Sequence, residues 1–403
     1  MQPIVADVII VGAGPAGLAA AIAAGRSALV LERNPHAGKK LLLSGSGQCN
    51  FTNSLESDEF LRACGKYAHF LKPAFHTLDN RKLIALLESA GCPVLIRADG
   101  KAFPASLRSE DVRNVLLSSA EQHGARFNYG TLIRKVSYSE GFHLTDAQGR
   151  EYRCERLILA GGGASWQQTG SDGSIYTLAE ALGHTIASPQ PALAAVEIAA
   201  YSRWRECAGV SLHKVTARFK TETDSFNGSG DLLWTHTGLS GPLIINNSHR
   251  LRRSDKILLH LVPRAEERIP ELLLLNPKQN VLSALKRTGL PASLLNAILA
   301  AVDAEPGIAC SELRKDARKR VTKALSCLEL SISAVESLRT AMATSGGVVL
   351  SEVKAANLAS KLCPGLFFAG EMLDYDLPTG GFNIQMAVST GWLAGLSAKK
   401  YSR

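Results

Sequence analysis

Three glycines near the start of the chain have the spacing and the surroundings of a dinucleotide-binding turn. Gly12, Gly14 and Gly17 read G-x-G-x-x-G, directly after the apolar run at residues 8–11. The first glycine permits a sharp turn, the second leaves room for a diphosphate, and the third lets the next helix pack closely. Glu32, 20 residues after Gly12, ends a second apolar run and suits a pair of ribose hydroxyls. The residues therefore predict a strand–turn–helix–strand unit that binds FAD or NAD.

The residues beside this turn extend the candidate site. Pro15 and Ala16 open the expected helix, whose N-terminal N–H groups and partial positive charge favour a diphosphate. Residues 34–54 follow the acid and are rich in small and amide side chains, as in a loop whose backbone follows a polar ligand. Its Lys39 and Lys40 can neutralise phosphate, and an ordinary surface loop is the alternative.

A second glycine run follows another expected strand. Residues 157–160 are apolar and end in Ala160, which Gly161 and Gly162 follow. The run lacks a third glycine at the right spacing and an acid after a further strand. We therefore interpret it as a strand whose end returns to the same cofactor, not as a second dinucleotide site.

Composition predicts a cytoplasmic protein of more than one domain. The chain has 403 residues, is 46% hydrophobic, and lacks an apolar run of the roughly 18 residues that a membrane span needs. Its eight cysteines stand singly without a C-x-x-C pair, so we expect no metal site and a reducing compartment. The net charge is +9, and residues 191–344 hold 21 Lys and Arg against 15 Asp and Glu. This excess favours either solubility alone or an anionic partner, RNA included.

Changes of pattern along the chain predict an inserted domain. Residues 191–265 alternate between apolar and polar as strands do, and residues 266–340 have helical periodicity. The expected boundaries give a nucleotide-binding domain in two parts and a substrate domain between them, at 1–190, 345–403 and 191–344.

Motifs along nearly the whole chain resemble the FAD-dependent oxidoreductases of the BaiN-like and aminoacetone-oxidase-like family. The matching stretches are 12–17, 39–42, 49–53, 159–162, 169–171, 235–242, 345–348, 370–374 and 380–385. The resemblance implies an α/β fold: a Rossmann-like, glutathione-reductase-type FAD domain with an inserted β-rich plus helical domain. It also implies FAD as the cofactor, with the three glycines on its diphosphate and Glu32 on its ribose.

Further FAD contacts follow from the resemblance, position by position. The candidates are Arg33 beside the ribose acid; Lys40, Ser44, Gly45, Gly47 and Asn50 near the phosphates or flavin; Ile133 at the adenine; Ala160, Gly161, Gly162, Gly370 and Glu371 along the diphosphate and ribityl chain; and Gly381, Phe382 and Asn383 at the flavin pyrimidine edge. A helix that opens at Gly381 would stabilise the negative charge of reduced flavin at that edge.

Two stretches depart from the family pattern. The family reads Gly-Gly-Arg-Cys-Asn where this chain reads Gly-Gln-Cys-Asn at residues 47–50, so that a neutral amide, Gln48, replaces a cation. The aspartate-rich stretch before the last glycine pair is also altered, at residues 374–378. Both departures concern the substrate more than the flavin.

The resemblance predicts a flavin enzyme that uses NAD(P)H as a transient reductant and reduces an activated carbon–carbon double bond in a small molecule. His236 is the candidate general acid or substrate anchor, because the pKa of histidine suits proton transfer near neutral pH. A structural histidine in a loop is the alternative. Cys49 is the candidate redox or acid group beside the flavin, with a packing role as the alternative.

Other activities stay open at this stage. The family also includes amine oxidation and a branch linked to dihydrouridine in ribosomal RNA, which the basic insert favours. A flavin-binding redox module without turnover is a further alternative. We expect no membrane partner.

Overall fold

The structure, a computed structural model, describes residues 2–401 and divides into two compact units. Met1–Ala192 and Leu338–Arg403 form the first unit, and Leu193–Ser337 form the second, which we call the inserted unit. The sequence analysis placed these boundaries at 190/191 and 344/345. The return to the first unit comes earlier because the backbone carbonyl of Leu338 accepts a hydrogen bond from the N–H of Trp166, and the strand that starts at Ala343 pairs with a strand of that unit.

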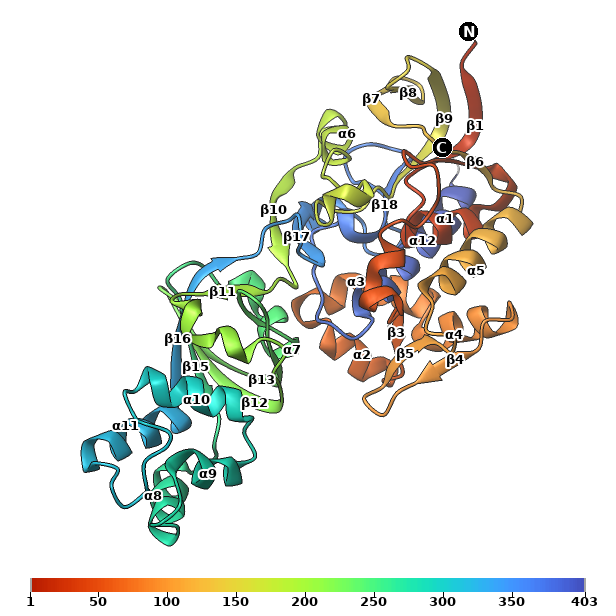
Figure 1. Cartoon of the computed structure of the whole chain (residues 1–403). Coiled ribbons are helices and arrows are strands. Elements are labelled where there is room, and N and C mark those ends of the chain that lie inside the picture. The colour runs from red at the N-terminus through yellow and green to blue at the C-terminus, as the bar shows by residue number, and fades with distance from the viewer. Residues whose placement is uncertain (1, 402–403) are drawn as a thin grey trace. The chain divides into compact units, whose positions relative to one another are not determined.

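A seven-stranded sheet forms the middle of the first unit (Figure 1). Its order is β6-β2-β1-β9-β8-β7, and β18 also pairs with β9. The strands are β1 (Ile4–Val11), β2 (Ala28–Leu31), β6 (Arg126–Asn128), β7 (Ile133–Tyr138), β8 (Phe142–Asp146), β9 (Glu151–Leu159) and β18 (Leu366–Phe368). The pairs β1–β2, β1–β9, β2–β6 and β9–β18 are parallel, so the ends of these strands meet at one edge. Val8, Ile9 and Ile10 are fully buried, as expected of a central parallel strand.

Helix α1 (Pro15–Ala24) packs against β1 and against the last helix, α12 (Phe382–Lys400) (Figure 1). Nearly all of α1 is buried, and its alanines leave room for neighbouring backbones. A Cβ atom at Gly391 of α12 would lie 2.0 Å from the carbonyl oxygen of Ala16. The remaining helices of this unit are α2 (Ser57–Ala63), α3 (Ala68–Thr77), α4 (Asn80–Ser89), α5 (Ser109–Gln122) and α6 (Tyr176–Ala181).

Two small sheets complete the first unit. β3 (Thr52–Asn53), β5 (Lys101–Pro104) and β4 (Val94–Ile96) form one antiparallel sheet. β10 (Ile186–Ala192) and β17 (Ala343–Val348) form the other, where the chain leaves and re-enters the unit.

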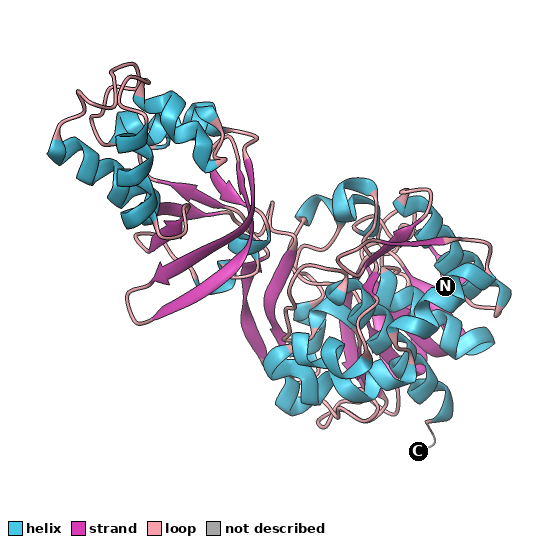
Figure 2. Ribbon diagram, turned by 90° about the horizontal axis from the view of Figure 1, so that it is seen from below, coloured by secondary structure: helices cyan, strands magenta, loops and turns pink. Residues whose placement is uncertain are grey.

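The inserted unit is a closed barrel with helices attached (Figure 2). Its strands, in barrel order, are β11 (Val196–Ile198), β14 (Gly238–Ser240), β13 (Ser225–Trp234), β12 (Ser211–Lys220), β15 (Lys256–His260) and β16 (Leu328–Val335). Its helices are α7 (Pro242–Ile245), α8 (Ala265–Leu275), α9 (Val281–Leu285), α10 (Ala292–Ala301) and α11 (Lys315–Ser326). Trp204 and Trp234 stack in its core with ring centroids 5.2 Å apart.

The prediction of helix throughout residues 266–340 is wrong at its end. The last helix stops at Ser326, and β16 closes the barrel between β15 and β11. Leu328, Leu330 and Ile332 alternate into the core, which is a strand pattern. Leu328 also follows Val321 and Leu325 of α11 at helical spacing, which extends the helical periodicity past the end of the helix.

Among residues 2–401, no helix combines the length and the apolar character that crossing a membrane requires.

The close approach of α1 and α12 predicts a large effect of one added methyl group. Gly391→Ala should destabilise the ligand-free protein by about 3 kcal/mol, because overpacking pushes two backbones apart. Urea unfolding measures this change. Gly14→Ala is the matched control, since its Cβ position has no atom within 4 Å, and it should cost less than about 1 kcal/mol. Equal losses in the two variants would contradict the packing argument.

Candidate functional site

The turn between β1 and α1 is tightly packed on one side and open on the other. Gly12 has φ +104°, and a Cβ atom there would lie 2.6 Å from the carbonyl oxygen of Ala160. At Gly17 a Cβ atom would lie 1.8 Å from the carbonyl oxygen of Gly12. At Gly14 no atom lies within 4 Å of the Cβ position. The turn therefore leaves a space at the N-terminus of α1, where Pro15 is the first helical residue.

Glu32, directly after β2, holds this turn from the side. Its Oε2 accepts a hydrogen bond from the backbone N–H of Ala13 at 2.7 Å. Its Oε1 accepts from the backbone N–H and the side-chain Nδ2 of Asn34, at 2.8 and 2.7 Å. The backbone carbonyl of Glu32 accepts from the backbone N–H of Thr131 at 2.8 Å. Ile133, the first residue of β7, is two residues after Thr131. The acid and the glycine turn thus lie side by side, as ribose and diphosphate binding requires.

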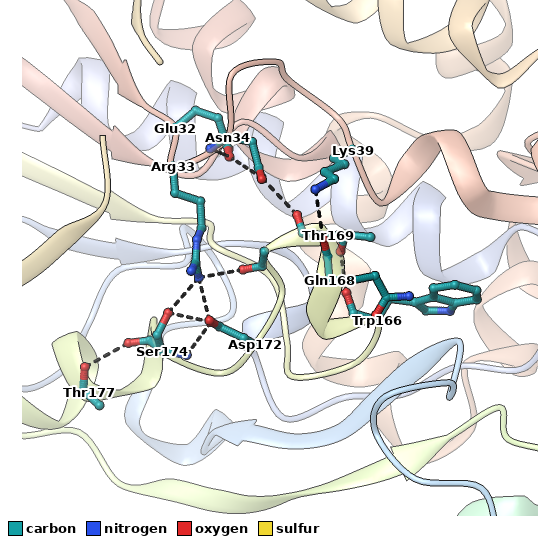
Figure 3. Close-up of polar contacts among 11 residues, drawn as sticks. Glu32, Arg33, Asn34, Lys39, Trp166, Gln168, Thr169, Asp172, Ser174 and Thr177 are labelled. Atoms are coloured by element: carbon teal, nitrogen blue, oxygen red, sulfur yellow. Dashed lines mark hydrogen bonds and ion pairs between the residues drawn. The ribbon is translucent and has the colours of Figure 1, made fainter. Parts of the chain in front are cut away.

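Residues 166–174 are bound to residues 33–39 by polar contacts (Figure 3). Nη1 of Arg33 lies 2.8 Å from Oδ2 of Asp172 and donates to the carbonyl oxygen of Gly170 at 3.1 Å. Two further side chains donate to backbone carbonyls, Asn34 to Thr169 at 3.0 Å and Lys39 to Gln168 at 2.9 Å. Arg33 and Lys39 therefore have protein partners already and fix the shape of this segment.

Two buried hydroxyl groups in or after this segment have no hydrogen-bond partner among residues 2–401. They are Oγ of Ser171 and the hydroxyl of Tyr176. A Cβ atom at Gly162 would lie 2.9 Å from Oγ of Ser171, so this hydroxyl faces the glycine run after β9. Gly161 lies against Ile175, where a Cβ atom would be 2.8 Å from Cγ1. Buried polar groups are nearly always paired, so these two hydroxyls are free to bind a water molecule or a polar ligand atom.

A lysine–glutamate pair lies at the end of β18. Nζ of Lys40 lies 2.6 Å from Oε2 of Glu371 and donates to Oγ of Ser165 at 2.6 Å. Oε1 of Glu371 accepts from Ser165 Oγ at 3.0 Å and from the backbone N–H of Thr344 at 2.9 Å. Gly370 brings this cluster to α1, because a Cβ atom there would lie 2.7 Å from the Cβ of Ala16.

The loop at residues 44–50 contacts the N-terminus of α12. In the amide orientation that satisfies both ends of Asn50, its oxygen accepts from the backbone N–H of Gly381 at 3.1 Å, and its nitrogen donates to the carbonyl oxygens of Thr52 and Ala102 at 2.9 and 3.1 Å. Oγ of Ser44 donates to the carbonyl oxygen of Leu41. Left-handed backbone occurs at Gly45, Ser46, Gly47 and Cys49, with φ between 55° and 86°. Such strain at non-glycine residues concentrates at functional sites.

The first turn of α12 is fixed by its own side chains. Phe382 is buried and packs against Phe60 with ring centroids 4.6 Å apart. Nδ2 of Asn383 donates to the carbonyl oxygen of Leu377 at 2.8 Å, and its Oδ1 accepts from the N–H of the same residue. In the altered aspartate stretch, Oδ1 of Asp376 accepts from the Tyr67 hydroxyl at 3.0 Å.

The two candidate catalytic residues lie in very different surroundings. Cys49 is fully buried, and burial raises the pKa of its thiol to about 12, so that it stays protonated at neutral pH. This favours the packing role for Cys49. His236 is exposed in the turn between β13 and β14 of the inserted unit, whereas the candidate cofactor residues all belong to the first unit.

The polar partners Ser165, Asp172 and Thr344 were not among the sequence candidates. Each contacts a residue more than 100 positions away: Ser165 contacts Lys40, Asp172 contacts Arg33, and the Thr344 hydroxyl accepts from the backbone N–H of Ala164. A single hydroxyl or acid in a loop has no distinctive spacing, so no pattern in the sequence marks these residues.

FAD fits the residues that the first unit presents. The space beside Gly14 lies at a helix N-terminus, which suits a diphosphate, and buried Glu32 lies next to it. The unpaired hydroxyls of Ser171 and Tyr176 offer further polar contacts.

Comparison with known proteins identifies the family. The model described as "HI0933-like protein Rossmann domain" matches residues 6–397. The chain belongs to the HI0933-like family. The predicted FAD-dependent oxidoreductase class and the Rossmann-type FAD domain with an inserted domain are thereby confirmed.

Relatives of this HI0933-like chain carry two different names. It is 27% identical over 394 residues to "Ribosomal RNA dihydrouridine synthase" of Escherichia coli (strain K12), covering 96% of each chain. It is 26% identical over 404 residues to "3-dehydro-bile acid delta(4,6)-reductase" of Clostridium scindens, covering 96% of this chain and 98% of the relative. The solved 3-ketosteroid-delta4-(5alpha)-dehydrogenase from Rhodococcus jostii RHA1 has a similar fold, with a TM-score of 0.50, 17% identity and coverage of 100% and 98%.

The open space beside Gly14 predicts a substitution that separates folding from cofactor binding. Gly14→Val should leave the ligand-free fold intact, since φ is −74° and the Cβ position is free, yet fill the place of the diphosphate. FAD affinity should fall at least about 100-fold, or about 2.7 kcal/mol, in a fluorescence titration. Gly307→Val, also at an open position, should bind FAD normally. A Gly14→Val protein that retains FAD would contradict the placement.

Proposed function

We propose that this chain is an FAD-dependent reductase that uses NAD(P)H to reduce a carbon–carbon double bond conjugated to a carbonyl group. The observation that carries the proposal is the dinucleotide-shaped site of the first unit, formed by the Gly14 space and Glu32. The names of two relatives support this choice of bond, because making dihydrouridine and reducing a delta(4,6) bile acid both convert a carbon–carbon double bond to a single bond.

In this proposal, two sets of residues in the first unit bind the two halves of FAD. Gly12, Gly14, Gly17 and Glu32 hold the ADP half. The flavin half takes Lys40, Glu371, the loop at residues 44–50 and the N-terminus of α12. FAD, when bound, supplies two-electron exchange between reductant and substrate.

The chain's own residues supply charge and protons. The N-terminal N–H groups of α12, a helix of 19 residues, stabilise negative charge placed before them. Saturating a double bond takes a hydride on one carbon and a proton on the next, so an acid or water must give that proton. The sequence contains no second dinucleotide-binding motif, so we propose that NAD(P)H binds only transiently.

His236 is our candidate for the proton donor or substrate anchor. His236→Ala should lower substrate turnover about 100-fold while FAD stays bound, because general acids contribute about that much. Steady-state kinetics with bound FAD quantified by absorbance test this. His213→Ala, an exposed histidine 3.2 Å from Asp231 in the same unit, is the control. Unchanged turnover in His236→Ala would remove this residue from the mechanism.

Uridine in ribosomal RNA is a second candidate substrate. Besides the name of the relative, the outer face of β12 favours it, since Lys214, Arg218 and Lys220 are all exposed there. Such a row can contact phosphates, and binding through it would weaken steeply as salt rises. A small-molecule substrate predicts no such dependence.

The experiment that tests the proposed function is anaerobic mixing of the FAD-loaded protein with NADH or NADPH. Bleaching of the flavin absorbance within seconds is the expected result. Cyclohexenone and ribosomal RNA, added separately, should then restore the absorbance for whichever substrate class is right. No bleaching with either nucleotide would contradict the proposal and favour an amine oxidase, which its own amine substrate would reduce, or a flavin-binding module without turnover.

A further inference from the structure

Arg97 places a guanidinium group against the loop at residues 44–50. Its Nη2 donates to Oε1 of Gln48 at 2.8 Å, and its Cζ lies 3.9 Å from the ring centroid of Phe103. Phe103 is buried and also approaches Gly45, where a Cβ atom would lie 3.8 Å from Cε1. An arginine stacked on a ring loses less conformational freedom when it binds a ligand, because its position is already set.

The hairpin that holds Arg97 is fastened to this same loop. The residue follows β4, and its backbone N–H donates to the carbonyl oxygen of Lys101 in β5 at 2.9 Å. β5 pairs with β3 in the register Thr52 with Ala102, and Phe51 donates to Ala102 at 3.1 Å. The guanidinium therefore keeps a fixed place beside Gln48, two positions before Asn50, which contacts the start of α12.

The charge of Arg97 is not neutralised within the part of the chain that the structure describes. Its side-chain hydrogen bond goes to a neutral amide, and no carboxylate lies within 4.0 Å of it in residues 2–401. The acid in the same turn, Asp99, pairs with Lys101 at 2.7 Å. The exposed Arg81 of the same unit, by contrast, is paired with the carboxylate of Glu56. An exposed, oriented and uncompensated guanidinium suits a bidentate anion.

From this arrangement we infer that Arg97, oriented by Gln48 and Phe103, binds a phosphate or carboxylate group of the molecule that exchanges hydride at this site. The anion belongs either to the NAD(P)H reductant or to the substrate. The inference rests on the proposed function, because it assigns the flavin to the adjoining loop. It adds a specificity-determining residue for which the sequence contained no motif.

The test uses the FAD-loaded protein with Arg97→Gln, Arg97→Lys and the control Arg81→Gln. One arm measures how the rate of anaerobic flavin bleaching saturates with NADPH. The other titrates the oxidised protein with uridine 5′-monophosphate and with uridine, following the flavin spectrum. Arg97→Gln should weaken binding about tenfold in one of the two arms. A loss of NADPH binding would show that the anion belongs to the reductant, and a loss of uridine 5′-monophosphate binding would show that it belongs to the substrate. The affinity of Arg97→Lys should lie between those of the wild-type and Arg97→Gln proteins. The affinity for uridine should be the same in all variants, and Arg81→Gln should bind every ligand as the wild type does.

The outcomes separate this inference from the function beneath it. Unchanged binding in both arms by flavin-loaded Arg97→Gln would overturn the role of Arg97 and leave the proposed reductase standing. An equal loss for uridine and its monophosphate would also overturn it, since the effect would then be structural. A wild-type chain that holds no FAD would defeat the proposed function and this inference together.

Discussion

The first unit depends on the close packing of α1 against two other backbone segments, the turn after β1 and helix α12. At Gly17 the helix approaches the turn after β1, and at Gly391 the last helix approaches α1, each at a distance that leaves no room for a Cβ atom. Gly395 repeats this approach one turn later, 2.3 Å from the carbonyl oxygen of Ala20. These contacts fix the N-terminus of α1 beside Gly14 and tie α12, whose own N-terminus contacts Asn50, to the same helix. Both positive helix ends thus belong to one rigid arrangement.

Charged side chains then connect segments that are distant in sequence. Glu32 binds the glycine turn, Arg33 binds Asp172, and Lys40 binds Glu371, so residues 32–40 contact the turns that follow three parallel strands. The ligands of open α/β sheets bind at such strand ends. The site is therefore assembled from loops at one edge of the sheet, and each loop is held by a partner on another.

The part of the fold that follows local rules was predictable from the sequence. The G-x-G-x-x-G turn and the acid at Glu32 have fixed spacing because one strand–turn–helix–strand unit contains both, and the structure places the acid against the turn. β16 was missed because Leu328 continues the helical spacing of α11, although the alternation of Leu328, Leu330 and Ile332 with polar residues is a strand pattern. Arg97 and Gln48 are 49 positions apart in the sequence, and Lys40 and Glu371 are 331 positions apart. No local pattern in any of these segments predicts such a contact.

The space beside Gly14 and the position of Glu32 imply that the first unit binds FAD by its ADP half as well as by its flavin. The most direct measurement is a calorimetric titration of cofactor-free protein with FAD and, separately, with FMN, which lacks the adenosine monophosphate portion. We expect one FAD per chain and an affinity for FAD at least about 100-fold above that for FMN, since the contacts at Glu32 and the N-terminus of α1 are lost with FMN. Equal affinities for the two flavins would show that the Gly14 turn and Glu32 do not bind the adenosine portion.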